Sequence, residues 1–326
     1  MVNHQPINLA KWQQHAWLNR LQSLLLLMVM AGFFALLGWL LWGSDGVIIF
    51  LLTGFMGVLL NSFIAPRLVM NLYGARPVQP EQMPALAEAI NILAHRAELT
   101  TIPRLYIIPS QILNAFAVGT KNESAIALTD GLLRQLNLNE LTAVLAHEIS
   151  HIQNNDLWVM GLADMFSRTT SMFSLFGQIL LFMNLPLIML SEVNINWFAI
   201  FLLLFAPNLS ALAQLSLSRT REFNADLNAV HLTGDPDSLI SALLKIEASQ
   251  GDWMEHIFMP GRREPVPSVL RTHPPTEERV LRLQSLKTDL KDRPKINLGD
   301  KLKYHHDTIG NAVNRPPHWH ISGLWH

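Results

Sequence analysis

The sequence predicts a mainly α-helical protein with a small β-sheet, an α+β fold that carries two long hydrophobic helical hairpins. Four segments of about twenty residues are almost free of charge, as membrane-crossing helices are. Three short runs near the middle of the chain have the composition of strands, and other segments repeat apolar residues at three- and four-residue spacing. Half of the 326 residues are hydrophobic and only 15% are charged, which is too apolar for an ordinary soluble enzyme.

Charge and cysteine content exclude several classes of function. The net charge is -1 and no basic run is interleaved with aromatic residues, so we expect no nucleic-acid partner. The chain has no cysteine, which excludes disulfides and thiolate metal sites. Any bound metal must therefore be held by nitrogen and oxygen atoms.

The first hydrophobic hairpin follows a short N-terminal segment, residues 1–20, and occupies residues 21–66. Its two apolar runs, Leu21–Trp42 and Gly46–Ala65, are each long enough to cross a hydrocarbon core of about 30 Å, and Gly43–Ser44–Asp45 is the turn between them. A secretory signal is the alternative, but the first run is too long and a second span follows at once. We interpret it as a retained anchor.

The second hydrophobic hairpin, residues 172–217, combines the runs Met172–Leu190 and Trp197–Leu217. It contains polar residues and prolines, which a membrane tolerates only against protein or a cavity. A hydrophobic hairpin in a large soluble core is therefore the alternative to two membrane spans. The interrupting residues are Gln178, Asn184, Pro186, Pro207, Asn208 and Gln214.

Basic residues flank both hairpins on one side only. The connections Gly43–Gly46 and Ser191–Asn196 carry no Lys or Arg, and cytoplasmic loops are the ones enriched in these residues. Both chain ends and the region between the hairpins are thus predicted to be cytoplasmic. The flanking residues are Lys11, Arg20, Arg67, Arg76, Arg168, Arg219 and Arg221.

Between the hairpins, residues 67–171 begin with an amphipathic helix over Pro80–Leu99. Strand-like runs follow, and the turn 119–123 is expected to join the last two as a hairpin. These runs are Arg104–Ile108, Ala115–Val118 and Ala125–Thr129.

The next segment contains His147-Glu148-Ile149-Ser150-His151, an H-E-x-x-H pentapeptide in a helix that Asn137 and Glu140 are expected to cap. Histidines four residues apart lie one turn above each other, so both rings can reach one zinc ion. Glu148 can then reach a metal-bound water. The spacing predicts a zinc site together with its general base.

A third ligand is expected from residues 218–288. Glu222 is the candidate, and Asp226 lies one helical turn beyond it, where it can accept the free N–H of a ligating histidine. The alternative is a solvated helix face on which Arg219 and Arg221 pair with these acids.

The rest of this region is predicted as a helix over Pro236–Ser249, a loop over Gly251–Pro275 and a helix that starts at Thr276. On spacing alone, His273 is an unremarkable loop histidine. The tail, residues 289–326, is polar and histidine-rich, and we assign it no function.

Taken together, these motifs resemble those of the M48 zinc metallopeptidases, and the four-span layout is most similar to the HtpX heat-shock protease branch. The similarity covers about Leu21 to Leu286. The motifs that carry it, in the family's order, are Asn114-Ala115-Phe116-Ala117, His147-Glu148-Ile149-Ser150-His151, Arg221-Glu222-Phe223-Asn224-Ala225-Asp226 and Thr272-His273-Pro274-Pro275.

The resemblance implies a zincin-like (gluzincin) domain in two parts, residues 67–171 and 218–288, with one Zn²⁺ per chain. It implies zinc ligation by His147, His151 and Glu222 and a catalytic base at Glu148. It further implies that Asp226 orients a ligand, that His273 acts near the tetrahedral intermediate, and that substrate pairs with the strand containing Asn114, Ala115, Phe116 and Ala117.

The function that the resemblance implies is a zinc endopeptidase of the bacterial inner membrane. It would face the cytoplasm, contact the lipid bilayer and act on misfolded or membrane proteins, in the stress response. Processing of prenylated (CAAX) proteins is one alternative. An inactive zincin-fold scaffold is another, although a structural zinc site has no need of Glu148. Self-cleavage in the loop 251–275 is a further expectation.

Overall fold

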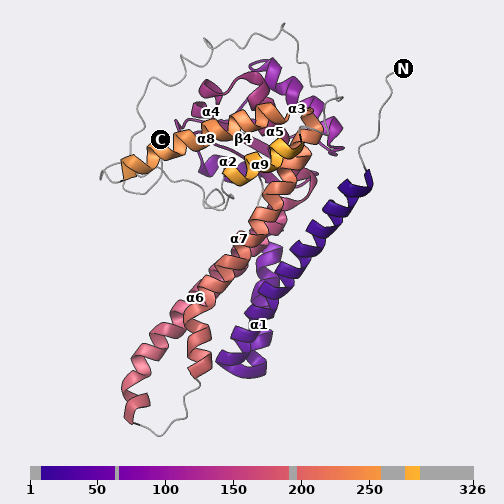
Figure 1. Cartoon of the computed structure of the whole chain (residues 1–326). Helices are drawn as coiled ribbons and strands as arrows, with labels where there is room; N and C mark the ends of the chain where they lie inside the picture. Colours follow the sequence, from indigo (N-terminus) through magenta and orange to yellow (C-terminus); the bar gives the residue numbers. More distant parts are fainter. Residues whose placement is uncertain (1–8, 63–65, 191–196, 258–275, 287–326) are drawn as a thin grey trace. The chain divides into compact units, whose positions relative to one another are not determined.

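The computed structural model describes residues 9–62, 66–190, 197–257 and 276–286. It confirms the predicted class, since the chain is mainly helical with a small mixed sheet (Figure 1). The elements are α1 (Leu9–Ser62), α2 (Pro66–Leu72), β1 (Arg76–Pro77), α3 (Pro84–Arg96), β2 (Arg104–Ile108), β3 (Ala115–Gly119), β4 (Ser124–Thr129), α4 (Asp130–Gln135), α5 (Leu138–Gln153), α6 (Asp156–Leu190), α7 (Trp197–Thr233), α8 (Pro236–Ile257) and α9 (Thr276–Leu286).

The chain forms two compact units. The helical unit comprises Met1–Phe63 and Trp158–Arg221, and the α+β unit comprises Ile64–Leu157 and Glu222–His326. Two of the three unit boundaries fall inside helices, one in α6 and one in α7. A single helix, α7, therefore carries both the second run of the predicted hydrophobic hairpin and the predicted ligand Glu222.

Within the helical unit, α1 folds back on itself (Figure 1). Gly43 has a φ of 61°, a left-handed conformation that glycine adopts without strain, and it lies in the predicted turn. A Cβ added to Gly54 would lie 3.7 Å from the Phe34 ring and 3.5 Å from that of Phe166 in α6. The two arms of α1 therefore meet each other and α6.

Helices α6 and α7 approach closely where Gly177 faces Leu203, because a Cβ at Gly177 would lie only 2.7 Å from a Leu203 methyl carbon. Nearby, the Ser174 hydroxyl donates to the Leu203 carbonyl over 2.5 Å, and the Gln178 amide donates to the Ser174 oxygen. Polar residues of the second hairpin thus bond to other groups of the same unit, as a nonpolar environment requires.

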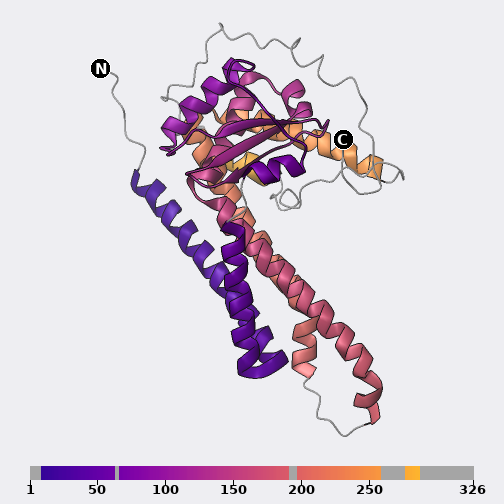
Figure 2. The same cartoon turned by 180° about the vertical axis from the view of Figure 1, so that it is seen from behind.

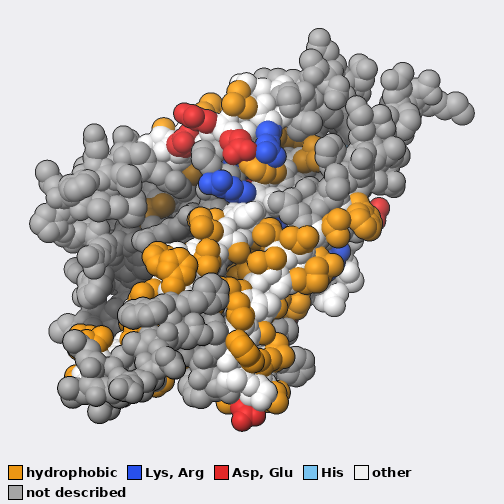
Figure 3. Space-filling model, turned by 60° about the horizontal axis from the view of Figure 1, so that its bottom comes forward, with side chains coloured by type: hydrophobic (Ala, Val, Ile, Leu, Met, Phe, Trp, Pro, Cys, Tyr) orange, Lys and Arg blue, Asp and Glu red, His pale blue; other side chains and the backbone are white. Residues whose placement is uncertain are grey.

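Large hydrophobic side chains are exposed along α1, α6 and α7, and they dominate the coloured surface in Figure 3. Among the described residues, one helical stretch, Ile200–Thr233, is long and apolar enough to cross a membrane, and its most apolar 18-residue window has a mean hydropathy of 1.8. Ser23–Leu36 and Gly43–Gly54 are shorter apolar stretches. The two transmembrane hairpins therefore stay a prediction.

The sheet of the α+β unit has the strand order β1-β2-β4-β3, in which β2 and β4 are parallel and the other pairs antiparallel (Figure 2). The three strands and the β3–β4 hairpin that the sequence predicts are present. Gly119 ends β3 with a φ of 102°, and a Cβ there would lie 2.1 Å from the Glu123 carbonyl oxygen, so the turn requires glycine. The two-residue β1 was not predicted.

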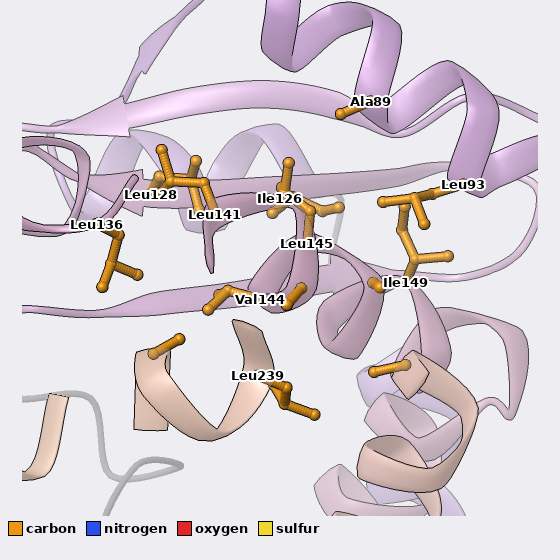
Figure 4. Close-up of a cluster of buried hydrophobic side chains, with 14 of the residues drawn as sticks. Ala89, Leu93, Ile126, Leu128, Leu136, Leu141, Val144, Leu145, Ile149 and Leu239 are labelled. Carbon is orange, nitrogen blue, oxygen red and sulfur yellow. The ribbon is translucent and has the colours of Figure 1, made fainter. Parts of the chain in front are cut away.

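The main core lies between one face of this sheet and the helices α3, α5 and α8 (Figure 4). Successive side chains along a strand point to opposite faces of the sheet. Ile126 and Leu128 therefore enter this core, while Ala125 and Ala127 lie on the opposite face beside Met70 of α2. Helix α5 contributes Leu141, Val144, Leu145 and Ile149. The packing holds α5 rigidly against the sheet.

Glu140 fixes the start of α5. The Asn137 side chain accepts from the Glu140 backbone N–H over 2.9 Å, and Glu140 accepts from the Asn137 N–H over 2.8 Å, which confirms the predicted cap as a capping box. The Glu140 carboxylate also binds Lys245 and Ser241 of α8 at 2.7 and 2.6 Å. The cap therefore ties α5 to α8.

We expect Glu140→Gln to destabilise the fold by about 1–2 kcal/mol at neutral pH. Burial raises the pKa of Glu140, but the hydrogen bonds from Lys245, Ser241 and the Asn137 backbone outweigh this, so its pKa lies below the usual range. Such stability is present above the unfolded-state pKa and is lost as the pH falls through the folded-state pKa.

The measurement is thermal unfolding of chelator-treated wild type and variant at pH 7 and at pH 3. The difference between them should shrink at the lower pH. The control is Glu88→Gln, an exposed residue of α3, which should leave the midpoint unchanged. An equal difference at both pH values would contradict the assignment.

Candidate metal centre

Helix α5 brings two histidine rings together at one point. His147 and His151 are 6% and 9% exposed, and their Nε2 atoms lie 3.2 Å apart with the ring planes at 89°. Their four-residue spacing places both on one face of the helix, as the sequence predicts. The Nε2 atoms of both rings therefore face the same small space.

Glu222 of α7 supplies the third group. Its Oε2 lies 3.4 Å from the His147 Nε2, and its Oε1 lies 3.7 Å from the His151 Nε2. One ligand atom from each of the three buried residues lies within 4.8 Å of the others. Ligand atoms about 2.0–2.1 Å from a tetrahedral zinc ion stand about 3.3–3.4 Å apart, so this set of nitrogen and oxygen atoms fits zinc.

The second nitrogen of each ring meets a carboxylate. The His147 Nδ1 lies 3.0 Å from the Asp226 Oδ1, which is the partner that helical spacing predicts. The His151 Nδ1 lies 2.9 Å from the Asp156 Oδ2. A carboxylate that accepts the Nδ1–H leaves the Nε2 lone pair free for a metal and holds the ring in place.

Asp156 was missed by sequence reasoning. It is the first residue of α6, five positions after His151, and the chain turns between the two helices at Asn155, which has a φ of 55°. Because helical periodicity does not extend across such a break, spacing could not place Asp156 beside His151. The only signal was an acidic residue directly after the H-E-x-x-H helix.

Arg279 of α9 was also missed. Its Nε and Nη2 atoms donate to the two Asp226 oxygens over 2.7 and 2.6 Å, and its Nη1 lies 3.4 Å from the Glu222 Oε2. At 5% exposed it is the one buried Lys or Arg among the described residues. The sequence did contain a sign that Arg279 is buried. Arg279 is next to Val280 and one turn from Leu283, and these two residues form the apolar face of α9.

The carboxylates make the site favourable for positive charge. Burial lowers the pKa of His147, but the hydrogen bonds to Asp226 and Glu222 raise it to about 10. Burial likewise lowers the pKa of His151, and Asp156 and Glu222 raise it above the usual range. A site that attracts a proton this strongly in the absence of metal will also attract a metal cation.

Glu148 lies between the two histidines on α5 and is buried at 8% exposed. Burial lowers the pKa of Arg279, but the charges of Asp226, Glu222 and Glu148 raise it above its usual value. The Glu148 carboxylate is therefore within electrostatic range of Arg279. The role of Glu148 as general base stays a prediction. His273, predicted to act near the tetrahedral intermediate, lies outside the described residues.

The predicted substrate strand forms the edge of the sheet. Asn114 precedes β3, whose first residues are Ala115, Phe116 and Ala117, and β3 ends the strand order. Among the described residues no strand pairs with its outer edge. β3 also packs against α5, the helix of the two histidines.

Comparison with known proteins gives consistent matches. The family model described as "Peptidase family M48" matches residues 80–287. A "Protease HtpX homolog" from Pelotomaculum thermopropionicum is 33% identical over 280 residues, covering 82% of this chain and 99% of that protein. One from Sulfurihydrogenibium sp. is 33% identical over 289 residues (82% and 96%), and one from Acaryochloris marina is 34% identical over 297 residues (85% and 96%).

Among solved structures, S. mikatae Ste24p is similar with a TM-score of 0.43 and 22% sequence identity. The match covers 83% of this chain and 66% of that one.

Proposed function

The chain belongs to peptidase family M48 and is an HtpX-type protease, and from this premise we propose that it is a membrane-bound zinc endopeptidase. The observation that carries the proposal is the convergence of His147, His151 and Glu222, three buried residues that each offer one ligand atom within 4.8 Å of the others. Glu148, adjacent to the first ligand, supplies a general base, which a purely structural zinc site does not need.

In the proposed mechanism, zinc when bound lowers the pKa of water and polarises the scissile carbonyl. Glu148 accepts the proton of the attacking water and delivers it to the nitrogen of the leaving amine. Asp226 and Asp156 hold the two imidazoles in the tautomer that presents Nε2. His273 is proposed to act near the tetrahedral intermediate, as the family resemblance implies.

Substrate binding is proposed at β3. The Asn114 N–H donates to the Thr129 Oγ1 over 3.0 Å, and the Asn114 carbonyl accepts from the Thr129 N–H over 3.0 Å. Both backbone groups of Asn114 therefore face β4. Along an antiparallel strand the backbone groups alternate in direction. Ala115 and Ala117 therefore direct their N–H and C=O groups outward, where an extended peptide can pair with them.

The test is degradation of casein by the detergent-purified full-length chain. We expect cleavage with zinc and loss of cleavage after chelation, because the three ligands release zinc to an excess of chelator. Re-addition of zinc should restore cleavage, which serves as the control for irreversible damage. Cleavage that persists in the chelator would contradict the zinc mechanism, and no cleavage under any condition would favour an inactive scaffold.

We further propose that the α+β unit faces the cytoplasm of a bacterial inner membrane, where the enzyme degrades misfolded or membrane proteins. Two features support this: the exposed apolar side chains of α1, α6 and α7, and the basic residues that flank the hydrophobic runs while their short connections carry none.

The absence of cysteine makes this orientation testable. We expect a membrane-impermeant maleimide to label Ser44→Cys in spheroplasts, and to label Asn122→Cys only after the membrane is opened. Both positions are exposed in the folded protein, so a difference in labelling reports the membrane and not burial of the cysteine. Labelling of Asn122→Cys alone in sealed spheroplasts would reverse the orientation, and labelling of both would exclude a membrane barrier between them.

A further inference from the structure

Buried negative charge is concentrated near the two histidines. Glu222 and Asp226 contact His147, Asp156 contacts His151, and Glu148 is adjacent to His147 in sequence; all are buried. Burying a carboxylate is unfavourable unless an opposite charge and hydrogen bonds compensate it. Arg279 is the one buried Lys or Arg that the described residues provide.

The contact between Arg279 and Asp226 has a specific geometry. The guanidinium donates from two nitrogens, one to each carboxylate oxygen, at 2.7 and 2.6 Å. This two-bond arrangement fixes both the position and the plane of the carboxylate. The oxygen that Nη2 contacts, Oδ1, is also the atom 3.0 Å from the His147 Nδ1. The chain of contacts therefore runs from Arg279 through Asp226 to His147, whose Nδ1 also lies 3.5 Å from the Arg279 Nη2.

Helix α9 delivers Arg279 from a separate part of the sequence and is itself anchored. Leu283 is buried in the main core, and the Arg282 guanidinium lies 3.5 Å from the centre of the Phe223 ring, beside Glu222 in sequence. α9 also packs against α8. The guanidinium of Arg279 thus comes from a docked helix whose position does not depend on Asp226 alone.

We propose that Arg279 is a positioning residue of the zinc site, which holds Asp226 by both oxygens so that Asp226 fixes the His147 ring with its Nε2 directed at zinc. This rests on the proposed function, because it assumes that His147 is a ligand. Arg279 acts through Asp226 and needs no contact with substrate. Lysine cannot replace it fully, since an ammonium carries the charge without the planar pair of donors.

The test compares zinc affinity, measured by competition with a chromogenic chelator, for full-length wild type, Arg279→Gln and Arg279→Lys. Removing a residue that supports a metal ligand from outside the coordination sphere typically weakens metal binding about 10–100-fold, and we expect a loss in this range for Arg279→Gln. Arg279→Lys should lose less. The matched control is Arg104→Gln, which makes the same substitution at the exposed first residue of β2, outside the metal group; its affinity should stay within about threefold of wild type.

A double-mutant cycle separates positioning from a general role in folding. In an Asp226→Asn background, Arg279→Gln should weaken zinc binding much less than it does alone, because the residue through which it acts is already altered. Independent structural effects would instead multiply, and equal losses in both backgrounds would overturn the proposal. So would wild-type affinity in Arg279→Gln. If Arg279→Gln fails to fold, the same comparison is made with Arg279→Lys.

The outcome is distinguishable from failure of the proposed function. If the wild-type chain binds zinc but cleaves nothing, a loss of affinity in Arg279→Gln would still support positioning while the protease proposal fails. If the wild type cleaves casein and Arg279→Gln has the same affinity and the same kcat/KM, positioning fails while the protease proposal stands.

Discussion

Glu148→Gln is expected to lower kcat for casein cleavage by at least about 10³-fold while zinc stays bound. Glutamine has nearly the same size as glutamate, so the packing of α5 should be kept. Its amide cannot accept the proton of the attacking water, and general base catalysis is therefore lost. The three ligand side chains are unchanged, so the zinc content should remain at that of the wild type.

Two readouts are needed for this prediction: the initial rate of casein cleavage and the zinc content of the same preparation. Glu140→Gln is a matched control, because it makes the same substitution at another buried glutamate of α5, outside the ligand group. It should retain cleavage at a temperature where it is folded. Residual cleavage within about tenfold of wild type in Glu148→Gln would exclude Glu148 as the base.

Glu222→Ala is expected to remove the metal itself. Two imidazoles from one helix remain, and a catalytic zinc site holds its ion with three protein ligands. We expect the zinc content to fall from about one per chain to near zero after dialysis against a weak chelator, and cleavage to fall with it. Elemental analysis of the purified variant is the measurement.

The control for this variant is Glu247→Ala, which removes a glutamate of α8 that is not in the metal group. It should keep zinc and activity. Zinc retained at about one per chain in Glu222→Ala would mean that another residue is the third ligand. That result would contradict the ligand assignment without excluding a zinc enzyme.

Local patterns in the sequence predicted most of the secondary structure. The strands β2, β3 and β4 lie where the alternating apolar runs place them, and α5 begins at the predicted Asn137 cap. Helical periodicity places His147 one turn from His151 on α5 and Asp226 one turn from Glu222 on α7, and the fold then brings His147 next to Asp226. Spacing predicts which residues share a face of one helix, whereas the contact between the two helices depends on packing.

The contacts that the sequence did not predict join different helices. Asp156 reaches His151 across a helix break, and Arg279 of α9 reaches Asp226 of α7 from more than fifty residues away in sequence. Helical periodicity applies within one helix and therefore predicts neither contact. The strand β1 was not predicted, because its two residues, Arg76 and Pro77, are too few to show an alternating pattern.

The continuous helix α7 is a further difference. The composition predicted a hydrophobic run that ends at Leu217 and placed the third ligand in a separate region, residues 218–288, because the polarity changes there. The structure has a single helix from Trp197 to Thr233, since neither glycine nor proline interrupts this junction. A change in polarity along a helix marks a change of surroundings and not a helix end.

The most direct test of the zinc-peptidase account is titration of zinc-depleted protein with zinc while casein cleavage is followed. The account predicts no cleavage at the start, a linear rise with added zinc, and a plateau at about one zinc per chain. Glu148→Gln should bind the same amount without cleavage. Full cleavage by the zinc-depleted chain, or cleavage that does not depend on zinc added, would contradict the account.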